Sequence, residues 1–233
     1  MISILCEKHE KIKYSKILFE LLNIDNSYKS TSIIIFSILD FNFENKTVSG
    51  NLITQNKISP LTIQAPNVIY NFAKQKERVD KNKIKLLMKQ TDIIVKNEVN
   101  CFKQDMIMNM LLSESETKGF VLTNTSKQNN YGPIFTLYAI RANNGKWNSL
   151  NETTSVFYTP TLKIAECISN FIPSLTFCTI KFIINKDNSP FLMGFSGWNS
   201  SLLFEEQQFS LLSKFAKYFF SYSNPLNHFR RKW

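Results

Sequence analysis

The sequence predicts an α/β arrangement in the first half of the chain and an α+β arrangement in the second half. In the first half, short β-branched apolar runs alternate with segments whose apolar residues recur at helical spacing. In the second half, two pairs of apolar runs are each joined by polar turn residues, as in β-hairpins. The 233 residues are 43% hydrophobic and 20% charged, which is the composition of a globular protein. A chain of this length forms one large domain or two small ones.

In the first half, helices and strands are expected to alternate. Apolar side chains at positions 14, 17, 18, 21 and 22 recur at helical spacing and predict a helix over residues 11–22. Further helices are expected at 76–89 and 102–112, and strands at 32–39, 47–53, 67–70 and 92–95.

In the second half, two hairpins and two helices are expected in turn. They are a hairpin of 134–142 with 146–157, a helix at 161–171, a hairpin of 176–184 with 190–196, and an amphipathic helix at 204–222. A polar segment at 126–132 is the expected place for a boundary, near Lys127. It divides the chain into domains 1–126 and 127–233.

The second hairpin carries most of the chemical information. Two apolar runs, 182–184 and 191–195, flank a cluster of turn residues. The stretch resembles the closing hairpin of the ATP-grasp fold as found in the spore-coat-associated YheC/YheD family. That family has roughly the pattern Asp-Ile-Gly-Ile-Asp-Lys-x-Gly-x-x-Trp-Leu-Leu-Glu-Val-Asn. Aligned with it, the family's strand Asp falls on Lys181, its Glu on Gly194 and its Asn on Ser196.

The resemblance implies that these three positions held a magnesium ion bridging the phosphates of ATP. Magnesium requires oxygen ligands such as carboxylates and carbonyls. The side chains of Lys181 and Gly194 supply none, and a lysine ammonium repels the cation. We therefore expect neither ATP nor magnesium as a cofactor, although the intact family uses both. The sequence assigns no catalytic, cofactor-binding or metal-ligating residue.

Three further segments extend the resemblance over most of the chain. They are 66–77, which resembles a Pro-Asp-Val-Ile-Tyr-Asn-Arg segment; 100–112 with 120–125, which resembles an Asn-x-Phe-x-x-Lys helix and its exit; and 135–147, which resembles a hairpin ending in Asn-x-x-Gly-x-Trp. In the family, the nucleotide-clamping subdomain lies between the last two of these segments. This chain has only residues 126–132 in that place. The resemblance thus implies a shortened, degenerate member. In this interpretation residues 1–126 form a pre-ATP-grasp-like domain. Residues 127–233 form the remnant of an ATP-grasp domain that lacks the nucleotide-clamping subdomain.

The charge balance favours anionic partners, because 28 basic and 18 acidic residues give a net charge of +10. Basic residues gather in two places. They are the expected helix with Lys74, Lys76, Arg78, Lys81, Lys83, Lys85 and Lys89, and the C-terminal stretch 228–233. Either cluster is compatible with nucleic acid, with a polyanionic coat component or with solvent alone.

Cysteines, histidines and hydropathy indicate the compartment. Cys6, Cys101, Cys167 and Cys178 are too widely spaced to suggest a disulfide framework, which favours a reducing compartment. The two histidines lie near opposite ends of the chain and offer no metal cluster. No apolar run is long enough to cross a bilayer, and no signal peptide is evident. We expect a cytoplasmic protein without membrane insertion, to which the family resemblance adds the spore coat.

Several residues that could carry chemistry have simpler structural interpretations. The pair Glu205–Glu206 begins the last expected helix, where carboxylates favour the helix dipole. Arg141 is interpreted as a strand-surface residue and Asp187 as a turn residue. Core packing explains the methionines Met106, Met108 and Met110.

Three functions stay open. The substitutions at Lys181, Gly194 and Ser196 favour a non-catalytic protein with a binding or structural role, whose partners are spore-coat proteins or an anionic polymer. The first alternative is an ATP- and magnesium-dependent carboxylate–amine ligase. The second is a basic polyanion-binding protein, which only the charge supports. The sequence leaves open whether the protein is an enzyme, with the balance against catalysis.

Overall fold

The computed structural model describes residues 1–74, 78–121, 133–142, 144–151, 156–184, 187–198 and 209–222. The chain forms two compact units. Unit 1 comprises Met1–Asn100 and Ser200–Trp233, and unit 2 comprises Cys101–Asn199. The boundary expected between 126 and 127 lies outside the described residues. The units differ from the expected domains in two places, because residues 101–126 belong to unit 2 and the C-terminal helix belongs to unit 1.

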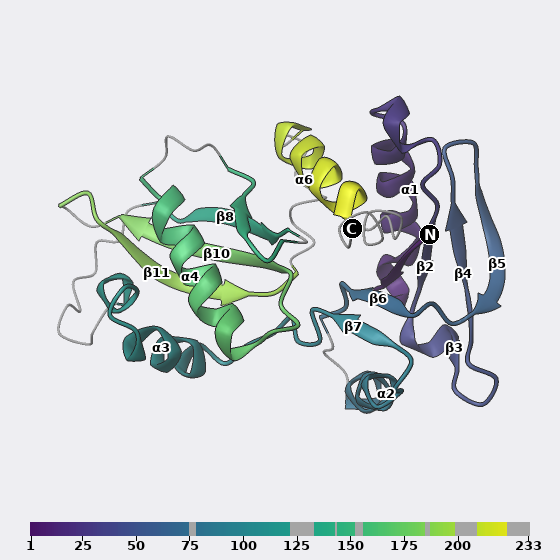
Figure 1. The fold of residues 1–233 in the computed structure, drawn as a ribbon, viewed down its shortest axis with the longest axis horizontal. Helices are drawn as coiled ribbons and strands as arrows, with labels where there is room; N and C mark the ends of the chain where they lie inside the picture. The colour runs from purple at the N-terminus through teal and green to yellow at the C-terminus, as the bar shows by residue number, and fades with distance from the viewer. Residues whose placement is uncertain are drawn as a thin grey trace, which may run out of the picture. The chain divides into compact units, whose positions relative to one another are not determined.

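Unit 1 is built on one mixed sheet (Figure 1). Its strands are β1 (Ile2–Leu5), β2 (Ile33–Phe36), β3 (Phe41–Asn42), β4 (Thr47–Ile53), β5 (Ile58–Gln64), β6 (Val68–Asn71) and β7 (Ile94–Lys96). The order is β3-β4-β2-β1-β6-β7, and β5 pairs with β4. The four strands β2, β1, β6 and β7 are parallel, whereas β4 runs antiparallel to β2, β3 and β5.

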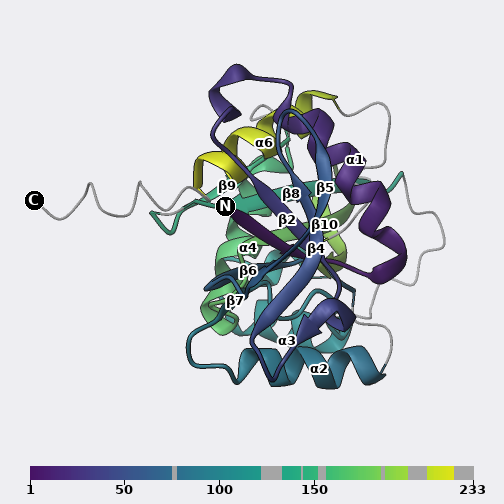
Figure 2. The same ribbon diagram turned by 90° about the vertical axis from the view of Figure 1, so that its right-hand side faces the viewer.

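Helices cover both faces of this sheet, as Figure 2 shows for α1 (Lys11–Leu22) and α2 (Arg78–Met88). Ile84 and Leu87 of α2 share a buried cluster with Ile34 and Ile69 of the sheet. Tyr70 follows Ile69 in β6 and therefore points to the opposite face. There its ring lies 5.0 Å from Phe219 of α6 (Phe209–Tyr222). Unit 1 is thus a three-layer α/β/α arrangement.

Unit 2 is an antiparallel sheet with helices on one face (Figure 1). Its strands β8 (Phe135–Arg141), β9 (Trp147–Ser149), β10 (Phe177–Ile184) and β11 (Pro190–Ser196) have the order β11-β10-β8-β9. The helices are α3 (Gln104–Ser113) and α4 (Tyr158–Phe171). Ile107 of α3 and Ile164 of α4 are fully buried in one cluster with Leu137, Ile180 and Phe182 of the strands. Short 3-10 turns occur at Lys8–Glu10, Asn26–Tyr28, Ile38–Asp40 and Lys118–Phe120.

Most expected elements are present, with shifted ends. The helix at 11–22 and the strands at 47–53 and 190–196 have the expected bounds. Helix α4 begins three residues earlier than expected, since Pro160 lies in its first turn, where a missing N–H costs no helical hydrogen bond. Of the strand expected over 146–157, the described residues form a strand at Trp147–Ser149, and residues 152–155 lie outside the described part of the chain. Residues 204–208 of the expected last helix lie outside the described part of the chain.

Three strands, β1, β3 and β5, were not expected. Ile2–Leu5 is fully buried between β2 and β6, and nothing in so short an apolar run separates a strand from the start of a helix. β5 is mostly exposed and contains Pro60. No helix among the described residues is long and apolar enough to cross a membrane.

Candidate functional site

The β10–β11 hairpin brings together the three positions that the sequence singled out. Lys181 pairs directly with Gly194, and Thr179 pairs with Ser196. Because directly opposed residues point to the same face, Lys181, Gly194 and Ser196 share one face of the hairpin. The pairing thus brings these three positions together on one face of the sheet.

A β-bulge next to Lys181 shapes this face. The register shifts between Lys181 and Phe182, and Phe182 pairs with Leu192, so Met193 is the extra residue on β11. Phe182 and Leu192 lie in the core beneath α3 and α4. Lys181 and Gly194 consequently belong to the opposite face of the sheet.

Strand β8 continues the same face with two hydroxyl-bearing residues. Thr136 pairs with Lys181, and Tyr138 pairs with Thr179. Two polar rows therefore cross the three strands; they are Thr136–Lys181–Gly194 and Tyr138–Thr179–Ser196. We call these six residues the polar face.

Burial differs sharply within the polar face. Thr179 is 1% exposed and Tyr138 is fully buried, whereas Lys181 is exposed and Ser196 is half-buried. The Thr179 hydroxyl oxygen is buried and has no hydrogen-bond partner among the described residues. A buried hydroxyl that lacks a partner costs about 1–3 kcal/mol. This is an unusual position for a threonine, because most buried polar atoms are satisfied.

The side chain of Lys181 lies along Gly194. A Cβ atom added to Gly194 would stand 3.8 Å from Lys181 Cβ and 3.9 Å from Lys181 Cδ. These are ordinary van der Waals distances, so the backbone does not require glycine here. Within the described part of the chain, no ion pair or hydrogen bond engages the Lys181 ammonium.

The polar face does not fit a magnesium ion. Of the three positions, only Ser196 offers a side-chain oxygen, and it is a neutral hydroxyl. Lys181 would place a positive charge beside a divalent cation. Elsewhere in the described ranges, no group of three or more His, Cys, Asp or Glu side chains could hold a metal ion.

A second polar cluster lies at the carboxyl ends of β1 and β2, in unit 1. Lys11 Nζ donates to Asp40 Oδ2 at 3.0 Å, and the Ser37 amide and hydroxyl donate to the same oxygen at 2.9 Å. Burial acts to raise the pKa of the Asp40 carboxyl, but these hydrogen bonds outweigh it and leave the pKa below its ordinary value. In parallel sheets this edge often binds ligands. Here Ser37 and Asp40 cap a 3-10 turn, and Asp40 also binds the Lys11 ammonium, so these residues have a structural role.

The Cys6 thiol beside this cluster is unsuited to nucleophilic chemistry. Burial, with a smaller contribution from Glu10, raises its pKa, so the thiol stays protonated near neutral pH. The sequence gave no signal for this cluster, because its members come from separate segments that only the fold assembles.

Two asparagines from the segments that carry the family resemblance meet in unit 1. Asn100 Nδ2 donates to the carbonyl oxygens of Asn71 at 2.7 Å and Ala73 at 3.0 Å. Asn71 Nδ2 in turn donates to the Asn97 carbonyl at 3.0 Å. All three asparagines are buried, and Asn97 has a positive φ of 54°. This network satisfies the backbone at the ends of β6 and β7, so the resembling segments have a structural role here.

The remaining candidates have structural positions. Arg141 ends β8, and its guanidinium donates to the carbonyl oxygens of Gly145 at 3.1 Å and Pro173 at 3.3 Å. Asp187 lies in the β10–β11 turn. Met108 and Met110 pack against the core of unit 2, but Met106 is 39% exposed, so the core interpretation is wrong for Met106.

The basic clusters are only partly described. Lys81, Lys85 and Lys89 are exposed and follow one another at four-residue spacing along and just beyond α2, while Lys83 is half-buried. Lys76, the Arg78 side chain, Glu205, Glu206 and residues 228–233 lie outside the described set.

Comparison with known proteins identifies the fold. No protein-family model and no curated protein matches the sequence. Among solved structures, the macrocyclase MdnB from Microcystis aeruginosa MRC is similar with a TM-score of 0.51 and 10% identity, over 93% of this chain and 98% of that chain. The D-alanine-D-alanine ligase from Coxiella burnetii gives 0.48 and 10%, over 97% of each chain. The enzyme of the same name from Aeromonas hydrophila gives 0.49 and 11%, over 100% of each chain.

The similarity to the macrocyclase shows a mixed α/β fold of the ATP-grasp kind. That part of the sequence interpretation is confirmed. At 10% identity the similarity concerns the fold alone and carries no activity or ligand to this chain.

Proposed function

We propose that this chain is a non-catalytic protein built on an ATP-grasp-like fold, with a binding or structural role. The observation that carries the proposal is the pairing of Lys181 with Gly194, next to Ser196, on one face of the β10–β11 hairpin. The apolar frame of the hairpin is intact, since Phe182, Leu192 and Phe195 are buried in the core of unit 2. The frame is thus kept while the oxygen ligands for a metal are missing.

The finer proposal is a degenerate YheC/YheD-like protein associated with the spore coat. Its support is the resemblance of the sequence over four segments, in order along the chain. Asn71 and Asn100 belong to two of these segments. In unit 1 the side-chain amide of Asn100 donates hydrogen bonds to the carbonyl oxygens of Asn71 and Ala73. On this proposal the partners are coat proteins or an anionic polymer.

Two alternatives have weaker support. A carboxylate–amine ligase needs a metal held near the nucleotide phosphates, and the polar face offers a lysine in that place. A polyanion-binding protein needs its cations on one surface. The exposed Lys81, Lys85 and Lys89 meet that condition over one helix only.

The test is calorimetric titration of ATP with magnesium into the purified full chain. The proposal predicts no saturable, magnesium-dependent heat and no ATP turnover, in the wild type and in Lys181→Ala alike. Lys181→Ala should also leave the free energy of unfolding nearly unchanged, because the side chain is exposed. Saturable magnesium-dependent binding, or a nucleotide-dependent activity that Lys181→Ala removes, would contradict the proposal.

A further inference from the structure

We infer that the exposed side of helix α2 binds the phosphate backbone of a double-stranded nucleic acid, through a row of three lysines and without sequence preference. We call Lys81, Lys85 and Lys89 the lysine row. The inference rests on the proposed binding role, whose partners include an anionic polymer, and it goes further by naming the polymer and the surface. Three observations support it: the spacing of the row, the lack of carboxylates beside it, and the use of the apolar side of α2 in the core.

The lysine row follows one side of α2 and the turn just after it. Residues four apart in a helix lie on the same side, about 6 Å apart along the axis. The Lys89 amide donates to the Leu86 carbonyl at 3.2 Å, which continues the helical turn as far as Lys89. All three lysines are exposed, and Figure 1 shows α2 at the outer margin of unit 1. The row is thus an open line of charges about 12 Å long.

No carboxylate neutralises the lysine row. Within the described ranges, no ion pair engages any of its members. Asp80 is the acidic residue of α2, and its spacing places it beside Lys83 instead. Asp92, which follows the row in sequence, pairs with Lys46 at 3.0 Å. Like charges four residues apart destabilise a helix. An anion along the row would remove this repulsion, and it would not have to break an ion pair first.

The apolar side of α2 is already used in the core of unit 1. Ile84 and Leu87 are buried in one cluster with residues of the sheet. Among the described side chains of α2, Leu86 is the exposed apolar one, at 50%. A helix that lies in a membrane surface needs a whole apolar side to insert, and a protein partner needs an apolar centre to its interface. The exposed side of α2 therefore favours a partner that is recognised by charge alone.

A double helix fits the lysine row better than a single strand does. Proteins that bind single strands use aromatic side chains on which the bases stack, and α2 contains no aromatic residue. A duplex presents a phosphate on each strand about every 3.4 Å along its axis. Flexible lysine side chains about 6 Å apart can each reach a phosphate oxygen as point charges. Because phosphate contacts carry no sequence information, we expect binding that is independent of base sequence.

The test is fluorescence anisotropy of a labelled DNA duplex of about 20 base pairs, titrated with the full chain between about 50 and 200 mM salt. We expect saturable binding that weakens as the salt concentration rises. The triple variant Lys81→Gln, Lys85→Gln, Lys89→Gln should bind about tenfold more weakly, or worse, at the lower salt concentration. It should also reduce the slope of log K against log salt by about 2–3, the counterions that three phosphate contacts release.

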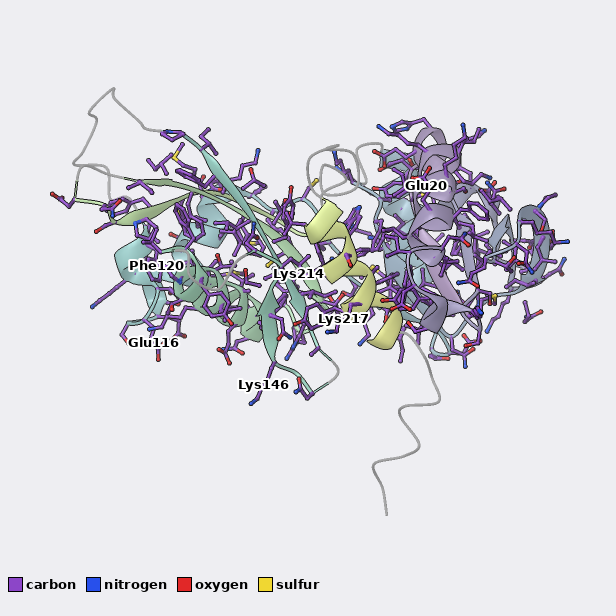
Figure 3. All side chains as sticks on the ribbon, turned by 90° about the horizontal axis from the view of Figure 1, so that it is seen from above. Glu20, Glu116, Phe120, Lys146, Lys214 and Lys217 are labelled. Carbon is purple, nitrogen blue, oxygen red and sulfur yellow. The ribbon has the colours of Figure 1, made fainter. Side chains whose placement is uncertain are left out.

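The matched control is the triple variant Lys16→Gln, Lys57→Gln, Lys146→Gln. It removes the same three charges from exposed lysines on separate elements, which are α1, the β4–β5 turn and the β8–β9 turn (Lys146 is labelled in Figure 3). Because both triple variants have the same net charge, the control should keep the affinity and the salt slope of the wild type. Equal weakening of binding in the two variants would show that net charge alone acts, and it would overturn the inference.

The melting temperature separates binding from folding. Glutamine and lysine have similar helix propensities, and the variant of the lysine row loses the repulsion between like charges. It should therefore melt at or above the temperature of the wild type while it loses affinity for the duplex. The inference is overturned if the duplex does not bind the wild type, whether or not vesicles of phosphatidylserine and phosphatidylcholine do. Failure of the proposed function is a different result, namely magnesium-dependent binding of ATP.

Discussion

At the scale of single residues, Asp40 shows how one carboxylate organises the start of unit 1. One of its oxygens accepts hydrogen bonds from the Lys11 ammonium, the Ser37 amide and the Ser37 hydroxyl. These bonds favour the charged form and hold the pKa of the carboxyl below its ordinary value, against the effect of burial. Since the side chain is 22% exposed, solvent screens the pair only in part.

We predict that Asp40→Asn lowers the free energy of unfolding at neutral pH by about 1–2 kcal/mol, because charge-assisted hydrogen bonds are lost. A group whose pKa is depressed by folding stabilises the folded state above its unfolded pKa, about 3.9 for aspartate. That contribution disappears as the pH falls through the lower folded value. Urea unfolding of wild type and variant should therefore differ at neutral pH and converge in acid.

The control for this prediction is Asp92→Asn. Asp92 pairs with Lys46 at 3.0 Å, but the two side chains are 53% and 42% exposed. Exposed pairs contribute little, so this variant should unfold like the wild type. A difference between Asp40→Asn and wild type that persists unchanged in acid would show that Asp40 stabilises the fold without its charge.

The sequence predicted some of these residue-level relations and not others. Lys181, Gly194 and Ser196 belong to one predicted hairpin, and the family resemblance singled them out together. Lys11 and Asp40 are 29 residues apart and meet only because β1 and β2 are parallel neighbours. No local pattern encodes that meeting.

At the scale of elements, the close approach of β2 and β4 depends on Gly50. A Cβ atom at this position would overlap the Ile35 carbonyl oxygen and stand 3.0 Å from its carbon. Both obstacles are backbone atoms of a buried strand, so they cannot move aside as a flexible side chain can. The residue is also buried on β4, between β2 and β5.

We predict that Gly50→Ala lowers the free energy of unfolding by about 1–3 kcal/mol, the range of overpacked interiors. The matched control is Gly119→Ala, since no atom lies within 4 Å of a Cβ added there. Denaturant unfolding of the two variants measures the difference directly. Equal stabilities would mean that β4 can move away from β2 without cost.

The edge strand β5 explains why one element escaped sequence analysis. Thr54 N donates to Lys57 O and Ala65 N donates to Lys46 O, which fixes the alternation of hydrogen-bonded pairs along β4 and β5. In this alternation the pair Asn51–Pro60 is a non-hydrogen-bonded pair. The nitrogen of Pro60 therefore points away from β4, so its missing N–H costs no hydrogen bond between the two strands. Proline in this position also hinders pairing with another strand. From sequence, Pro60 argues against a strand, and only the pairing shows why it is tolerated.

The C-terminal helix α6 is placed by aromatic contacts. Phe219 lies 5.0 Å from Tyr70 and 5.7 Å from Phe72, and Phe220 lies 4.9 Å from Tyr28, measured between ring centroids. Lys214 and Lys217, labelled in Figure 3, are exposed charged residues of the same helix. Its amphipathic spacing was visible in the sequence, but its partner was not. Sequence proximity suggested the second domain, whereas these aromatic contacts hold it in unit 1.

At the scale of the whole molecule, the fold class follows from alternation and hairpin patterns, which are local signals. The division into two units cannot be predicted from such local patterns, because it depends on contacts between segments that are distant in sequence, such as α6 and β6. The candidate site was found as a set of substituted positions. Its chemistry emerged only when the pairing added Thr136, Tyr138 and Thr179 to the same face.

The central claim is that the hairpin keeps the frame of a metal site and lacks only its ligands. Manganese binding, followed through the electron paramagnetic resonance signal of the free ion, tests it in the wild type and in the variant Lys181→Asp, Gly194→Glu, Ser196→Asn. Glutamate should fit at 194, where an added Cβ meets only ordinary contacts. We predict no binding by the wild type and saturable binding by the folded variant. Saturable binding by the wild type, or none by a variant that keeps the wild-type circular dichroism, would contradict the account.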